Sequence, residues 1–193
     1  MNIMIDTILF DLVGVLLFPK ENYAASRLAD EIDRQIGAVT NDIIFKEKIL
    51  REYDLLDNEF DNILQSIVNK YESFVPLWKL LPKLRKFYKL GIINNGTYHT
   101  YPHFEEKYHI SQRFDFFLSS AIEGVRKPDR AIYLRACEKS GSTPQSCLFM
   151  DDSEENIMGA QRVGMRTIHW SGKENGFQEF NNCIHTFGNI KTR

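Results

Sequence analysis

The sequence has few cysteines, no long apolar run and no basic block. Its 193 residues include 3 cysteines, an odd number without a C-x-x-C pair, which excludes a disulfide framework and a zinc knuckle. The longest apolar stretch, residues 8–18, is interrupted by Asp11 and is shorter than the roughly 18 residues that a membrane span requires. Lysines and arginines are scattered among the acidic residues and the net charge is −2, so we expect neither nucleic acid nor an anionic membrane as partner.

A secretory leader is also missing from the pattern. Met1 is not followed by the positive segment and small-residue cleavage site of a signal peptide. Together with the cysteine usage, this predicts a protein of the reducing cytoplasm. The sequence gives no indication of oligomeric state.

The composition is that of an ordinary globular protein. Hydrophobic residues make up 43% and charged residues 26% of the chain. A chain of this length buries about 70% of its unfolded surface, so its core needs no disulfide or zinc ion. The length fits one domain, or one domain with a modest insertion.

Short apolar runs alternate with segments of helical period. The first run, Thr7 to Phe10, predicts a buried strand that ends at Asp11. Further strands are expected at residues 90–93, 114–118, 147–150 and 165–170, with a short last one at 183–187. Helices are expected at residues 25–36, 42–53, 57–71, 101–108, 128–140 and 153–163. Pro82 is expected to begin one more helix, whose buried stripe is Leu84, Phe87 and Tyr88.

The order of these elements predicts the domain organisation. Strands separated by helices indicate a parallel sheet with helices on both faces, so we expect an α/β, doubly wound, Rossmann-like core. Residues 1–17 and 76–193 are assigned to this core. Residues 18–75 are expected to form a small all-helical insertion after the first strand.

Polar residues end three of the predicted strands. Asp11 follows the first, the segment Asn94-Asn95-Gly96 follows the second, and the pair Asp151-Asp152 follows a later one. In an open parallel sheet such ends line the ligand crevice. Carboxylates about 4 Å apart repel by roughly 4 kcal/mol at an effective dielectric constant near 20, so the three acids require a cation. Ligands that are all oxygen atoms favour Mg²⁺ as this cation. Lys127 lies in a loop that is expected to open on the same edge, where its ammonium can offset negative charge.

Four segments resemble, in order and spacing, the four motifs of the haloacid dehalogenase-like (HAD) hydrolase superfamily. They are Thr7 to Leu16, Gly91 to Gly96, Lys127-Pro128 and Leu148 to Ala160. The resemblance covers the whole chain, including a helical cap inserted after the first motif. It implies a Mg²⁺-dependent phosphohydrolase that acts on a small phosphorylated metabolite through an aspartyl-phosphate intermediate.

The resemblance also implies roles for individual residues. Asp11 matches the nucleophile and Lys127 matches the stabilising lysine. Asp151 and Asp152 match the acidic pair that binds the metal together with Asp11, and the main-chain carbonyl of Val13 supplies the remaining protein contact.

The substrate side of the site is expected from two regions. Asn94 and the adjacent Asn95-Gly96 backbone would hold the phosphoryl oxygens. Phe18 and Tyr23, where the chain leaves the core for the cap, are candidates for contact with the rest of the substrate.

The first two motifs depart from the family pattern. Val13 stands where members usually carry the Asp that protonates the leaving alcohol and then activates water. Loss of a positioned acid or base costs about 10²- to 10⁴-fold in rate, or roughly 3 to 5 kcal/mol, which favours a leaving group of low pKa such as that of an anomeric phosphate. Asn94 replaces the usual Ser or Thr, but its amide can still donate to a phosphoryl oxygen. The segment Arg126-Lys127-Pro128 is similar to that of a sugar-phosphate phosphatase branch that also lacks the Asp.

Two alternatives remain open. A catalytically retired member would bind a phosphorylated metabolite or a protein partner without turnover, and Val13 favours this interpretation. A 2-haloacid dehalogenase would also lack the Asp at this position, but dehalogenating members carry Ser and Asn where this chain has Asp151 and Asp152.

Overall fold

The computed structural model describes residues 4–24 and 26–187 and contains a five-stranded sheet. The strand order is β5-β4-β1-β6-β7, and every pairing between neighbours is parallel. The strands are β1 (Thr7–Phe10), β4 (Lys89–Asn94), β5 (Phe116–Ser119), β6 (Cys147–Asp151) and β7 (Arg166–His169). With β1 in the centre and the chain winding outwards in both directions, the doubly wound α/β core predicted from the sequence is confirmed.

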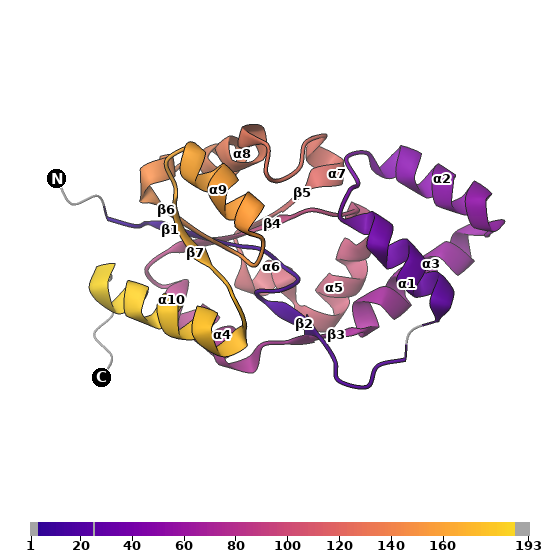
Figure 1. Cartoon of the computed structure of the whole chain (residues 1–193), viewed down its shortest axis with the longest axis horizontal. Helices are drawn as coiled ribbons and strands as arrows, with labels where there is room; N and C mark the ends of the chain where they lie inside the picture. The colour runs from indigo at the N-terminus through magenta and orange to yellow at the C-terminus, as the bar shows by residue number, and fades with distance from the viewer. Residues whose placement is uncertain (1–3, 25, 188–193) are drawn as a thin grey trace.

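Helices cover both faces of this sheet, with α8 and α9 on one side and α4 and α10 on the other (Figure 1). The core helices are α4 (Val75–Leu84), α5 (Tyr101–Tyr108), α6 (Ile110–Arg113), α7 (Ser120–Glu123), α8 (Arg130–Ser140), α9 (Glu154–Arg162) and α10 (Lys173–Phe187). Two short 3₁₀ helices, η1 (Tyr98–Thr100) and η2 (Pro144–Ser146), complete the core.

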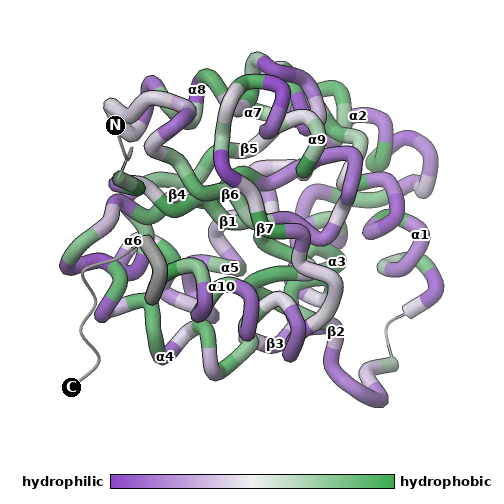
Figure 2. Tube along the Cα trace, turned by 60° about the vertical axis from the view of Figure 1, so that its left-hand side comes forward, coloured by the Kyte–Doolittle hydropathy of each residue, from purple (hydrophilic) through white to green (hydrophobic). Residues whose placement is uncertain are grey.

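The alternation of side chains along the strands divides the core into two apolar clusters. Ile8 and Phe10 of β1 face the cluster that includes α4 and α10, whereas Leu9 faces the cluster that includes α8 and α9. Because both faces of a parallel sheet are buried, the central strands β1, β4 and β6 are mostly apolar, as their hydropathy colouring shows (Figure 2).

The chain between β1 and α4 forms a separate group of elements beside the carboxyl ends of the sheet strands (Figure 1). It contains the helices α1 (Arg27–Ile36), α2 (Asp42–Tyr53) and α3 (Asp57–Asn69) and the strands β2 (Leu17–Pro19) and β3 (Tyr71–Ser73). The two strands pair antiparallel where the chain leaves and re-enters the core. The expectation of an all-helical insertion missed them, because three residues are too few to show a period.

Hydrogen bonds tie both junction strands to core helices. The indole N–H of Trp78 in α4 donates to the carbonyl oxygen of Leu16, 2.7 Å away, next to β2. The hydroxyl of Tyr108 and the ammonium of Lys107, both in α5, donate to the carbonyl oxygen of Tyr71 in β3, at 2.6 and 2.9 Å. The inserted elements are therefore held over the sheet edge from both ends.

Two sequence-based expectations outside the site are wrong. Residues 183–187 do not form a last strand but belong to α10, which packs the buried Phe180 and Ile184 against the sheet at a helical spacing of four. Pro82 lies near the end of α4 instead of at its start, since Pro76 takes the first turn, where a missing N–H leaves no bond unmade. Phe87 consequently falls after the helix and is exposed. Within the described residues, no helix combines the length and apolarity of a membrane span.

Candidate active site

Three carboxylates from different parts of the chain meet at the carboxyl edge of the sheet. Asp11 directly follows β1, Asp151 ends β6 and Asp152 comes next. One carboxylate oxygen of each lies within 4.8 Å of the others. The residues that the sequence analysis expected to converge are thus brought together, because adjacent parallel strands end side by side.

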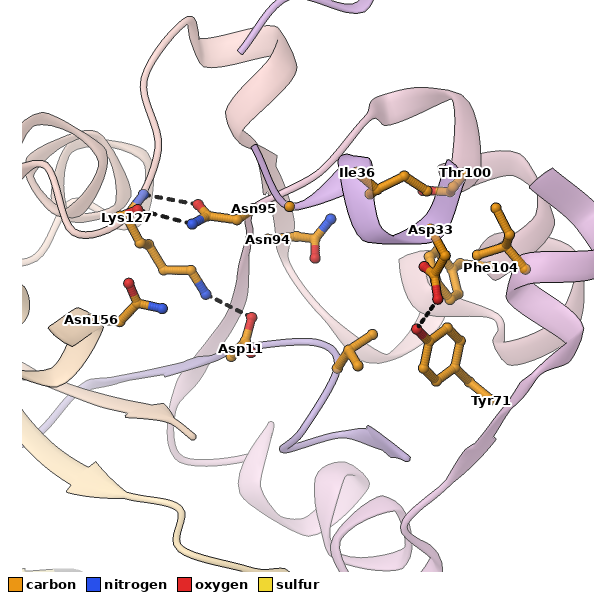
Figure 3. Close-up of a pocket in the computed structure, with 13 residues that line it drawn as sticks. Asp11, Asp33, Ile36, Tyr71, Asn94, Asn95, Thr100, Phe104, Lys127 and Asn156 are labelled. Atoms are coloured by element: carbon orange, nitrogen blue, oxygen red, sulfur yellow. Dashed lines mark hydrogen bonds and ion pairs between the residues drawn. The ribbon is translucent and has the colours of Figure 1, made fainter. Parts of the chain in front are cut away.

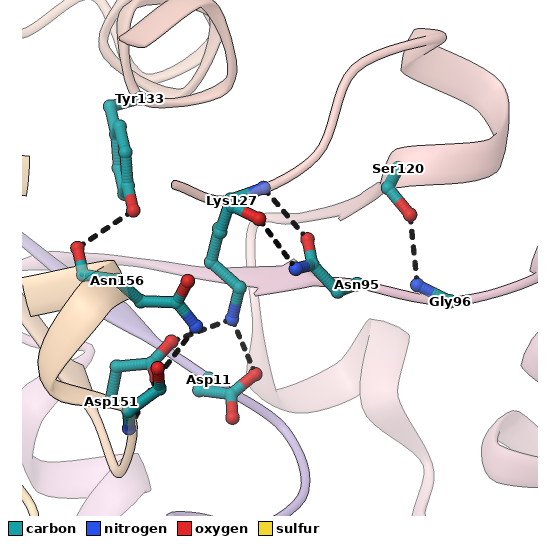
Figure 4. Close-up of polar contacts among 9 residues, drawn as sticks. Asp11, Asn95, Gly96, Ser120, Lys127, Tyr133, Asp151 and Asn156 are labelled. Carbon is teal, nitrogen blue, oxygen red and sulfur yellow. Dashed lines mark hydrogen bonds and ion pairs between the residues drawn. The ribbon is translucent and has the colours of Figure 1, made fainter. Parts of the chain in front are cut away.

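A buried ammonium lies between two of these acids (Figure 4). Nζ of Lys127, whose side chain is 1% exposed, is 2.6 Å from Oδ1 of Asp11 and 2.7 Å from Oδ2 of Asp151. Burial alone would lower the pKa of Lys127, but the two carboxylates raise it overall. Lys127 is therefore charged and neutralises part of the acidic cluster.

Other polar groups hold the lysine and the acid in place (Figure 4). The side-chain amide of Asn95 donates to the carbonyl oxygen of Lys127 at 2.9 Å, and its Oδ1 accepts from the Lys127 N–H at 2.8 Å. The side-chain amide of Asn156 and the backbone N–H of Ser153 both donate to Oδ1 of Asp151, at 3.0 and 2.9 Å. Asn95 thus fixes the lysine loop, and Asn156 and Ser153 fix the strand-end acid.

Two glycines allow this close assembly. A Cβ on Gly14, which has a positive φ of 101°, would lie 2.4 Å from Oδ2 of Asp152, so the carboxylate rests directly on the loop after β1. A Cβ on Gly159 in α9 would lie 2.7 Å from the carbonyl oxygen of Pro128. The helix after the acidic pair can therefore approach the lysine loop.

The charges of the site do not balance without another cation. The pKa of Asp11 is raised to about 7, because burial and the charges of Asp151 and Asp152 together outweigh the lowering by the ammonium of Lys127. Burial and Asp151 likewise raise the pKa of Asp152. When all three carboxylates are ionised, the cluster they form with Lys127 has a net charge of −2, and their oxygens are the donors that a hard divalent ion prefers. The residues present therefore fit Mg²⁺.

A cavity of about 210 Å³ opens beside the charged cluster (Figure 3). Its lining combines core residues with residues of α1, α3 and β3. These are Asp11, Val13, Asp33, Ile36, Gly37, Ile67, Tyr71, Asn94, Asn95, Thr100, Phe104, Lys127 and Asn156. The expected residues Val13, Asn94 and Asn95 thus border the same space as Asp11 and Lys127.

Three of the expected substrate contacts do not line this cavity. The ring of Phe18 packs edge-on against Phe74, with the centroids 5.9 Å apart. The hydroxyl of Tyr23 donates to the carbonyl oxygen of Ser66 at 3.0 Å. The backbone N–H of Gly96 donates to Oγ of Ser120 at 2.9 Å.

The residues that line the far side of the cavity are not among those predicted from the sequence. Asp33 follows the buried Ile32 in α1, and an acid beside an apolar stripe was the one available signal. Tyr71 and Phe104 have the apolar character of packing residues, so nothing in the sequence alone distinguished them from the rest of the core.

A model of the haloacid dehalogenase-like hydrolase family matches residues 5–164, which include all four motifs. The chain belongs to this family. The match, together with the sheet order and the acidic cluster, confirms the resemblance drawn from the sequence.

Curated relatives of this HAD-like hydrolase include phosphatases. The chain is 39% identical to a sesquiterpene phosphatase from Aspergillus oryzae over 56 residues, which are 29% of each chain. It is 28% identical to a pyrimidine 5′-nucleotidase from Escherichia coli over 156 residues, 76% of this chain and 68% of that one. Among solved structures, a HAD family enzyme from Bacteroides thetaiotaomicron in complex with magnesium and inorganic phosphate has a TM-score of 0.65 and 22% identity over 84% of this chain and 92% of that one. This likeness shows the fold.

The burial of Lys127 has a measurable consequence for stability. We predict that Lys127→Met lowers the free energy of unfolding by about 3 to 5 kcal/mol in the presence of EDTA, because it leaves two buried carboxylates without their counter-charge. Chemical denaturation followed by circular dichroism measures the change.

Lys70→Met is the matched control. Lys70 also binds two carboxylates, those of Asp30 and Asp33, at 3.3 and 3.0 Å, but its side chain is 26% exposed. Its loss should cost about 1 kcal/mol or less. Equal losses for the two variants would contradict the assigned importance of burial.

Proposed function

We propose that this protein hydrolyses small phosphate monoesters in the presence of Mg²⁺, with Asp11 as the nucleophile. The supporting observation is the contact of Asp11 with the buried Lys127 at 2.6 Å, beside Asp151 and Asp152 and on the wall of a cavity of about 210 Å³. The phosphatases among the curated relatives support the same substrate class. The cytoplasm remains the expected location.

In the first step, a carboxylate oxygen of Asp11 attacks phosphorus while the bond to the leaving oxygen breaks. Lys127 offsets the negative charge that gathers on the transferring group. The side-chain amide of Asn94, at the end of β4, donates to a phosphoryl oxygen. Bound Mg²⁺, held by Asp11, Asp151, Asp152 and the carbonyl of Val13, would supply electrostatic neutralisation of the phosphoryl group.

In the second step, water attacks phosphorus, phosphate leaves and the Asp11 carboxylate is regenerated. The apolar side chain of Val13 can neither protonate the leaving oxygen nor take a proton from this water. Protons must therefore come from solvent or substrate, and esters with a leaving group of low pKa react fastest. We assign residues 18–75 as the cap that closes over this reaction.

Two alternatives are distinguished by specific residues. A retired member that only binds its ligand is favoured by the apolar side chain of Val13 at the cavity wall, and it predicts no turnover. A 2-haloacid dehalogenase is opposed by the carboxylates of Asp151 and Asp152 beside Asp11. It predicts halide release in EDTA.

The nucleophile is tested by phosphate release from acetyl phosphate, whose leaving group needs no proton. The wild-type chain should require Mg²⁺, and Asp11→Asn should lower kcat by about 10³-fold or more, because the amide oxygen is a poor nucleophile. Asp61→Asn, on the exposed side of α3, serves as control and should keep the wild-type rate. Equal rates for wild type and Asp11→Asn would refute the proposal and support the retired member.

The role of Val13 is tested by restoring the usual acid. Val13→Asp should raise kcat for glycerol 3-phosphate about 10- to 10²-fold relative to acetyl phosphate, because only the alkyl ester has a leaving oxygen that must be protonated. Val13→Asn, whose side chain has the shape of Asp but transfers no proton, should leave the ratio of the two rates unchanged. A parallel change for both substrates would argue against the missing acid as the reason for slow alkyl esters.

A further inference from the structure

The end of the cavity away from Asp11 and Lys127 carries a second polar group, formed by Asp33 of α1 and Tyr71 of β3 (Figure 3). The hydroxyl of Tyr71 donates to Oδ2 of Asp33 at 3.0 Å. Nζ of Lys70 donates to the same oxygen, also at 3.0 Å. Both hydrogen bonds thus go to one oxygen of the carboxylate.

The side-chain hydroxyl hydrogens at this end of the cavity already take part in hydrogen bonds within the protein. The hydroxyl hydrogen of Tyr71 is used on Asp33, and Thr100, which lines the same cavity, donates its hydroxyl hydrogen to the carbonyl oxygen of Thr97 at 2.9 Å. Among the described residues, no donor lies within hydrogen-bond distance of Oδ1 of Asp33. The polar side chains of the far wall can therefore accept hydrogen bonds from a ligand but cannot donate them.

The net charge of this wall is negative, which also disfavours an anionic ligand group. Lys70 binds Asp30 and Asp33 together, so one ammonium faces two carboxylates and the group has a net charge of −1. The remaining far-wall side chains, Ile36, Ile67 and Phe104, are apolar. A second anionic group on a ligand would find repulsion and no donor here.

We propose that Asp33, with Tyr71 and Thr100, forms the subsite for the leaving group and selects phosphate esters of small alcohols that carry hydrogen-bond donors and no negative charge. A cavity of about 210 Å³ is below the range of about 300 to 1,000 Å³ that drug-sized ligands occupy. The alcohol portion is therefore a few carbons long and bears free hydroxyl groups. This inference rests on the proposed phosphatase function.

A matched pair of esters tests the selection. Glycerol 3-phosphate and 3-phosphoglycerate differ in one terminal group, a hydroxymethyl in the first and a carboxylate in the second. The wild-type chain should hydrolyse glycerol 3-phosphate with a kcat/KM at least about 10-fold higher, because its terminal hydroxyl can donate to the far wall, whereas 3-phosphoglycerate would place a carboxylate there.

The variant Asp33→Asn tests whether Asp33 causes this selection. The amide oxygen would accept the two donors from Tyr71 and Lys70, so its NH₂ group would replace the acceptor that faces the cavity. The preference for glycerol 3-phosphate over 3-phosphoglycerate should then fall at least about 10-fold. Asp30→Asn is the control, since it removes the same charge from the Lys70 group but does not line the cavity; it should change the preference less than about twofold.

The outcomes separate this inference from the proposed function. Mg²⁺-dependent hydrolysis of acetyl phosphate without a preference between the two esters would overturn the subsite alone. An equal shift in Asp30→Asn and Asp33→Asn would overturn the assignment to Asp33, because charge alone would explain it. Hydrolysis of none of the three substrates by the wild-type chain would overturn the function and the inference together.

Discussion

The structure of the site depends on one buried ammonium. Lys127 lies between the carboxylates of Asp11 and Asp151, and its ammonium opposes the rise that burial causes in the pKa of Asp11. Asp11 follows β1, the central strand, Asp151 ends the neighbouring strand β6, and Lys127 lies in a loop 116 residues after Asp11. The parallel sheet is what places them together, since its strand ends converge on one edge while the rest of each strand is buried in apolar clusters.

The side chains of two asparagines hold this assembly in place through hydrogen bonds. Asn95 holds the backbone of Lys127 on both its N–H and its carbonyl, and Asn156 orients Asp151. Side chains locked by such bonds lose little entropy when a ligand arrives, and in the proposed reaction the charges are already in place where negative charge would develop. In the proposed function the two ends of the cavity have different roles: the end with Lys127 and the three carboxylates takes the phosphoryl group, and the acceptor-lined end takes its alcohol.

The sequence predicted the core well because local signals and topology agree there. Apolar runs that end in Asp11, Asn94 and Asp151 are readable as strand ends, and their spacing carries the family motifs. Helical period also predicted α1, α2 and α3, whereas the segment 183–187 was misassigned because five residues cannot separate a strand from the end of a long helix.

The sequence alone could not predict which residues line the far side of the cavity, and the reason is tertiary packing. Asp33 and Tyr71 come from elements that meet only because β3 returns beside β2 and α1 packs on α3, and no local pattern records such a contact. Phe18 and Tyr23 lie where the chain leaves the core, but their side chains contact Phe74 and Ser66 and do not line the cavity. Sequence motifs locate the acidic cluster and Lys127, and packing decides which side chains line the cavity beside them.

The most direct test of the account is calorimetric titration of Mg²⁺ into the full chain, beside Asp152→Asn and the control Asp61→Asn. If the three carboxylates and Lys127 form a site that needs one divalent cation, the wild-type chain and the control bind a single ion and Asp152→Asn loses most of that affinity. Absence of Mg²⁺ binding by the wild-type chain at millimolar concentration, or equal binding by Asp152→Asn, would contradict it.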